Sequence, residues 1–89
     1  MAEELVDVRA EKFDERGCEP MLLFWYPEVG DHVEEGQDLC EIETAKAAFV
    51  IAASATGTLV EICVREGEPV GSEQLLGRIL VDSAAPSPG

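Results

Sequence analysis

Two β-capable segments meet around a single lysine in one stretch, which reads Leu39-Cys40-Glu41-Ile42-Glu43-Thr44-Ala45-Lys46-Ala47-Ala48-Phe49-Val50-Ile51. Residues 39–42 and 48–51 therefore predict a hairpin that bends at Ala45 and Lys46. Tight hairpins usually use Asn-Gly or Asp-Gly, because primed turns need positive φ, and this bend offers neither. We expect a type I turn that holds Lys46 in solvent. A broken local preference between regular strands is a place to look for function.

The chain has 89 residues, six Lys and Arg against nineteen Asp and Glu, and a formal net charge of −13. This length predicts one domain that buries roughly 60–65% of its unfolded surface. The charge repels nucleic acid and anionic membranes, so neither is expected as a partner. The N-terminus lacks a basic and then apolar leader, and no apolar run approaches the ~20 residues of a membrane span. We therefore expect a cytoplasmic location.

The sequence shows no catalytic or metal site. Cys18, Cys40 and Cys63 form an odd set without a close pair, which fits neither a disulfide framework nor a zinc site. Each is predicted to be a reduced, buried apolar residue. His32 stands alone in a turn and is expected to be a surface residue, and no phosphate-binding loop or nucleophile elbow occurs. The domain is thus expected to be non-catalytic in itself.

The rest of the chain reads as short strands separated by turns. Residues 4–8 predict a strand, and the charged residues 9–17 predict a surface loop. Residues 21–26 predict a strand between two prolines. Residues 29–36 predict turns, with glycines available for positive φ.

An internal repeat appears when the chain is shifted on itself by 37 positions without a gap. The matched pairs include Gly30 with Gly67, Val33 with Val70, Leu39 with Leu76, and Ile42 with Ile79. Two similar halves of about four short strands cannot bury their apolar faces alone. We expect them to pack face to face, with approximate two-fold symmetry, as a flattened β-sandwich or barrel. The second copy ends at residues 77–81, so only the first half displays a lysine hairpin.

Residues 43–47, Glu-Thr-Ala-Lys-Ala, resemble the Glu-Thr-Asp-Lys-Ala attachment sequence of lipoyl domains, the swinging-arm carriers of 2-oxo acid dehydrogenase complexes. The resemblance covers roughly residues 5–81. Gly36 lies ten residues before Lys46 and Gly57 eleven after it, where that family keeps glycines. The resemblance implies an all-β fold, a flattened barrel or sandwich of two four-stranded antiparallel sheets with internal pseudo-two-fold symmetry. It implies a domain over residues 1–82 with lipoate bound covalently to Lys46.

The resemblance also implies the partners of such a carrier. A lipoate ligase or lipoyl transferase would recognise the surroundings of Lys46, namely Glu43, Thr44, Ala45, Ala47, Gly36 and Gly57. A thiamin-dependent 2-oxo acid decarboxylase acylates the arm, an acyltransferase core passes the acyl group to coenzyme A, and dihydrolipoamide dehydrogenase reoxidises the dithiol. The isolated domain is expected to be a monomer. Residues 83–89 are similar to the start of an Ala/Pro-rich linker, although a frayed terminus explains them equally well.

Three departures from the lipoyl pattern, at four positions, keep alternatives open. Ala45 replaces the usual Asp, Pro20 replaces a glycine, and Val50 and Ala52 are apolar where the solvent face commonly carries Glu. Glycine-cleavage carriers are lipoylated within Glu-Ser-Val-Lys-Ala, and biotinyl domains flank their lysine with methionines. A glycine-cleavage-type carrier, a biotinyl carrier and an unmodified interaction module therefore remain alternatives to a dihydrolipoamide acyltransferase domain.

Overall fold

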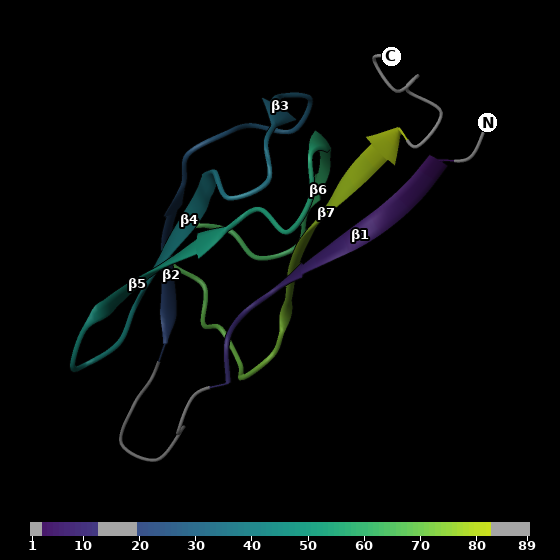
Figure 1. Ribbon diagram of the computed structural model, residues 1–89. Coiled ribbons are helices and arrows are strands. Elements are labelled where there is room, and N and C mark those ends of the chain that lie inside the picture. Colours follow the sequence, from purple (N-terminus) through teal and green to yellow (C-terminus); the bar gives the residue numbers. More distant parts are fainter. Residues whose placement is uncertain (1–2, 13–19, 83–89) are drawn as a thin grey trace.

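The computed structural model describes residues 3–12 and 20–82, and these form two antiparallel sheets (Figure 1). The seven strands in these ranges are β1 (Glu3–Arg9), β2 (Met21–Trp25), β3 (His32–Val33), β4 (Asp38–Glu43), β5 (Ala48–Ala52), β6 (Gly57–Ile62) and β7 (Leu75–Asp82). One sheet has the order β1-β7-β6-β3 and the other β2-β4-β5. The predicted all-β sandwich is confirmed. In the described residues, no helix is long and apolar enough to cross a membrane.

The second sheet has three strands where four were expected. Its fourth strand is reduced to a single bridge between Met21 and Pro69, next to a hydrogen bond from the Val70 N–H to the Pro20 carbonyl (2.9 Å). Pro69 has no N–H to donate, which limits the ladder beside β2. In the other sheet, the matching strand β3 has only two residues.

The predicted repeat is confirmed in the backbone pairing. In β4 and β5, Ile42 pairs with Phe49, and 37 residues later Ile79 of β7 pairs with Val6 of β1. The turns repeat as well, since the Gly30 N–H donates to Leu59 O (2.7 Å) as the Gly67 N–H does to Leu22 O (2.8 Å). The two-fold thus relates β2 to β6, β4 to β7, and β5 to β1.

The core lies between the two sheets and is built from repeat-related pairs. The pairs that are fully excluded from solvent are Leu22 with Leu59, Leu39 with Leu76, and Ile42 with Ile79. Burying such a side chain stabilises the fold by roughly 1.5–3 kcal/mol. Each of these pairs takes one residue from each half, so neither half can form this core alone.

The first connection differs from the prediction of a surface loop over residues 9–17. Arg9 ends β1, and Ala10 is only 5% exposed. The Ala10 N–H donates to Gln74 O (2.9 Å), which continues the pairing beyond the strand. Glu11 and Lys12 are exposed, as expected of a loop. Residues 13–17 lie outside the described residues.

The cysteines behave differently from one another. Cys40 is a buried free thiol, as predicted, and burial raises its pKa to about 12. Cys63 is also free but exposed, so its predicted burial is wrong. The repeat matches it with Tyr26, which is 51% exposed. Cys18 lies outside the described residues. His32 is exposed, as expected, although it belongs to β3.

Candidate modification site

Lys46 lies at the tip of the β4–β5 hairpin, which extends to the lower left of Figure 1, away from the start of β1 and the end of β7. Glu43 and Ala48 form the last strand pair, and the Thr44 N–H donates to Ala47 O (2.8 Å). Only Ala45 and Lys46 lie between Thr44 and Ala47. Glu73 is the sole non-glycine residue with positive φ in the described ranges. The bend is therefore not a primed turn, as predicted.

The Thr44 hydroxyl organises this bend. It donates to Ala47 O (3.0 Å) and accepts from the N–H groups of Lys46 (3.2 Å) and Ala47 (3.1 Å). Short hydroxyl side chains form such local bonds to the backbone in turns. Thr44 is buried, at 8% exposed, so it supports the bend from beneath. The sequence marked Thr44 only as part of a recognition motif, since nothing local reveals where its hydroxyl points.

The side chain of Lys46 is open to its surroundings. Lys46 is exposed, and so are Ala45, Ala47 and Glu43 around it. Among the described residues, no ion pair or side-chain hydrogen bond holds its ammonium group. Methyl side chains on both sides leave the amine accessible to an enzyme that would acylate it.

The structure does not bring Gly36 and Gly57, the two glycines predicted to be recognised by the ligase, to this tip. Gly36 has φ 88° and donates its N–H to Ala53 O (2.9 Å), beyond the end of β5 that lies away from Lys46. Gly57 begins β6 in the other sheet and pairs with Val33. A Cβ at Gly57 would meet the carbonyl of Leu80. The backbone therefore explains why each position is a glycine. The other predicted recognition residues do surround the lysine, namely Glu43, Thr44, Ala45 and Ala47.

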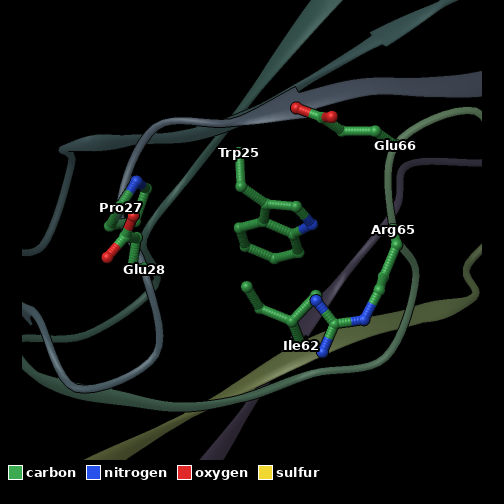
Figure 2. A pocket seen from close by; sticks show the side chains of 6 residues that line it. All are labelled: Trp25, Pro27, Glu28, Ile62, Arg65 and Glu66. Carbon is green, nitrogen blue, oxygen red and sulfur yellow. The ribbon is translucent and has the colours of Figure 1, made fainter.

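A cavity of about 420 Å³ lies elsewhere, between the two halves (Figure 2). Its lining residues are Trp25, Pro27, Glu28, Ile62, Arg65 and Glu66. Trp25 and Ile62 are related by the repeat, as are Glu28 and Arg65, so the cavity lies where the two halves meet. Trp25 is partly buried against the core and donates its Nε1–H to Val64 O (2.8 Å). None of the tip residues lines this cavity, which contains no Cys, His, Ser or Thr.

Replacing Thr44 by valine should lower the free energy of unfolding by about 1–2 kcal/mol, because a buried hydroxyl with three partners is lost. Thr44→Ser keeps the hydroxyl and is the matched control. Urea midpoints should separate the two variants, and the Ala47 amide should exchange with solvent faster in Thr44→Val. Equal midpoints and equal exchange in the two variants would show that the hydroxyl does not organise the bend.

Residues 15–79 match the family model described as biotin-requiring enzyme. The chain is 31% identical over 80 residues to the dihydrolipoyllysine-residue succinyltransferase component of the 2-oxoglutarate dehydrogenase complex of Azotobacter vinelandii, covering 90% of this chain and 20% of that protein. It is 44% identical over 57 residues to the biotin carboxyl carrier protein of acetyl-CoA carboxylase of Nostoc sp., covering 64% of this chain and 31% of that one.

A solved structure agrees with the fold. The solution structure of the lipoyl domain of the 2-oxoglutarate dehydrogenase complex from Azotobacter vinelandii superimposes with a TM-score of 0.70 at 31% identity. The match covers 86% of this chain and 96% of that domain. The chain therefore spans nearly the whole of a lipoyl domain, but only about a fifth of the succinyltransferase it matches.

Proposed function

The chain belongs to the biotinyl/lipoyl domain family as a lipoyl-type domain, and from this premise we propose that Lys46 is its attachment lysine and carries lipoate through an amide bond. One observation carries the proposal: Lys46 is exposed at a two-residue bend that a buried hydroxyl braces. Acylation removes the charge of a lysine. Because Lys46 has no ion pair among the described residues, its acylation breaks none of their contacts.

The residues of the tip fit such a group. The pairing of β4 with β5 and the bonds of Thr44 fix where Lys46 leaves the domain, so an enzyme meets the lysine in one orientation. Ala45 and Ala47 leave room on both sides. A bound lipoyl group supplies a ring disulfide that takes up an acyl group and two electrons, and the chemistry belongs to that group. This domain positions the arm and does not enclose it.

The proposed partners follow from the relatives, which are named as components of 2-oxoglutarate dehydrogenase complexes. We propose that a lipoate ligase or lipoyl transferase modifies Lys46. A thiamin-dependent 2-oxo acid decarboxylase then loads the arm, an acyltransferase core unloads it to coenzyme A, and dihydrolipoamide dehydrogenase reoxidises it. A carrier domain over residues 1–82 in the cytoplasm, tethered through residues 83–89, suits this scheme.

A biotinyl carrier is the second candidate, because the match to the Nostoc biotin carrier has the higher identity over a shorter span. The tip favours lipoate. Alanines flank Lys46 on both sides, whereas the resemblance to biotinyl domains requires methionines there. The two candidates predict different masses for the modified protein.

Intact mass of the protein co-expressed with a lipoate ligase and supplied with lipoate should increase by one lipoyl group. Lys46→Arg should show no increase, and Lys12→Arg is the matched control that should be lipoylated like the wild type. The experiment is repeated with a biotin ligase and biotin. Lipoylation that persists in Lys46→Arg, or biotin taken up in preference to lipoate by the wild type, would overturn the proposal.

A further inference from the structure

The two sheets turn outer faces to solvent that share one backbone plan. In the sheet that carries Lys46, Glu41 of β4 pairs with Phe24 of β2 and with Val50 of β5. In the other sheet, Arg78 of β7 pairs with Glu61 of β6 and with Asp7 of β1. The two-fold relates these rows position by position. Side chains directly opposite one another lie on the same face of a sheet, so the rows can be compared directly.

The outer face of the four-stranded sheet carries charges that satisfy one another. Arg78 binds Glu61 (Nη1 to Oε1, 2.7 Å) and Asp7 (Nε to Oδ1, 3.3 Å), and Arg9 binds Asp7 (Nη2 to Oδ2, 3.0 Å). The Arg9 guanidinium holds the pKa of Asp7 below its usual value, with Arg78 contributing. This face resembles an ordinary solvated surface, and such exposed pairs contribute little stability.

On the outer face of the β2-β4-β5 sheet, one row of paired residues combines two apolar side chains, Phe24 and Val50, with the carboxylate of Glu41. The two-fold places Phe24 where Glu61 lies, Glu41 where Arg78 lies, and Val50 where Asp7 lies. Phe24 packs edge-on against Tyr26 (ring centroids 5.0 Å apart, 80°), and the Tyr26 hydroxyl donates to Glu41 Oε1 (3.2 Å). Tyr26 is 51% exposed and Val50 43%. We call these four residues, Phe24, Tyr26, Glu41 and Val50, the lysine-sheet face.

Stability of the fold does not require apolar residues at these positions, because the same backbone carries Glu61, Arg78 and Asp7 on the opposite side. Aromatic side chains close together on a surface are typical of regions that bind other proteins, and here Tyr26 is exposed and Phe24 half-buried. The face therefore points to a contact that the chain makes with a partner.

Charge indicates the chemistry of that partner. The acidic residues of β2, β4 and β5 are Asp38, Glu41 and Glu43, and these three strands contain no Lys, Arg or His. Where the opposite sheet supplies Arg78 between two carboxylates, this sheet leaves Glu41 without a cationic partner among the described residues. An arginine from another protein would complete it. A second copy of this chain does not fit, because its own face is acidic and its net charge is −13.

We propose that the lysine-sheet face docks the 2-oxo acid decarboxylase that loads the arm, through an arginine flanked by apolar surface on that enzyme; this rests on the function proposed above. Glu41 precedes Glu43, the last paired residue before the tip, by two residues on β4. The row formed by Phe24, Glu41 and Val50 therefore lies about 7 Å along the strand from the base of the tip. A partner seated there has Lys46 at its edge and can receive the far end of a long arm. A ligase must instead enclose the lysine nitrogen itself and therefore the tip.

The test replaces side chains of the lysine-sheet face by those at the equivalent positions of the opposite face. The triple variant Phe24→Glu/Glu41→Arg/Val50→Asp reproduces the arrangement of Glu61, Arg78 and Asp7, so it has a precedent in the same fold. Both proteins are lipoylated, and the rate of reductive acylation is measured with the thiamin-dependent decarboxylase. We expect kcat/KM for the domain to fall about tenfold or more in the variant, with lipoylation by mass unchanged. Glu61→Gln, on the opposite face, is the control and should match the wild type.

The outcomes are distinct. Equal acylation of the wild type and the triple variant would overturn the docking proposal and leave the carrier function intact. Loss of lipoylation in the folded variant would overturn it too, by assigning the face to the ligase. Failure of the wild type to accept lipoate would overturn the carrier function itself. If the triple variant does not fold, Val50→Asp alone must lower kcat/KM while preserving lipoylation, or the proposal is overturned.

Discussion

Ile42→Ala and Ile79→Ala should each lower the free energy of unfolding by about 2–5 kcal/mol, whereas Lys46→Gln should lower it by no more than ~0.5 kcal/mol. Ile42 and Ile79 are fully buried and occupy equivalent positions in the two halves. Removing either leaves a cavity between the sheets that the partner half cannot fill. Lys46 is exposed and closes no core contact, so its replacement changes no buried surface.

Urea midpoints of the unmodified proteins measure the comparison, with equal m-values as the check that the same surface unfolds. Lipoylation should show the reverse order. Lys46→Gln abolishes it, while the folded fraction of each Ile variant accepts lipoate like the wild type. If Lys46→Gln destabilised the protein as much as Ile42→Ala, the lysine would be a structural residue, and the carrier function would lose its physical basis.

The hairpin and the repeat were predictable because each is a pattern of residue types along the chain. Alternation on either side of Ala45 and Lys46 and the shift of 37 positions are visible in the residues alone. The match of β5 with β1 was not visible. It places Val50 on Asp7, a shift of 43 positions in the opposite direction, so an ungapped comparison at 37 cannot show it. Only the strand register reveals that Val50 and Asp7 occupy equivalent positions on the two outer faces.

The details of the site depended on contacts that no local rule encodes. The hydroxyl of Thr44 points under the bend, and this orientation depends on the pairing of β4 with β5. Cys63 is exposed, as Tyr26 is at the equivalent position of the other half, against the usual preference of free cysteine for burial. For Pro69, the sequence shows that the residue has no N–H to donate, but it does not show that Pro69 lies beside β2.

Gly57→Ala should lower the free energy of unfolding by at least ~2 kcal/mol, because its new methyl group would meet the backbone of β7. The Cβ position at Gly57 runs into the carbonyl of Leu80 and lies 3.0 Å from Ile79 Cγ2. Leu80 is held in the ladder by pairs with Thr58 and with Leu5, so its carbonyl cannot swing away as a flexible side chain would.

Gly36→Ala is the matched comparison, since both glycines were predicted to be recognised by the ligase. Nothing lies within 4 Å of the Cβ position at Gly36, and its cost comes from φ 88° alone, about 1–2 kcal/mol. Its counterpart in the other half, Glu73, tolerates φ 60° with a full side chain. Urea midpoints should therefore rank wild type, Gly36→Ala and Gly57→Ala in decreasing order.

Lipoylation separates folding from recognition at these two positions. Lys46 lies at the opposite end of β5 from the carbonyl that Gly36 binds, and Gly57 lies in the other sheet. At a temperature where both variants are folded, each should accept lipoate to the same extent as the wild type, measured by intact mass. A folded Gly36→Ala or Gly57→Ala protein that the ligase fails to modify would show that the enzyme reads that glycine directly, far from the lysine it acylates.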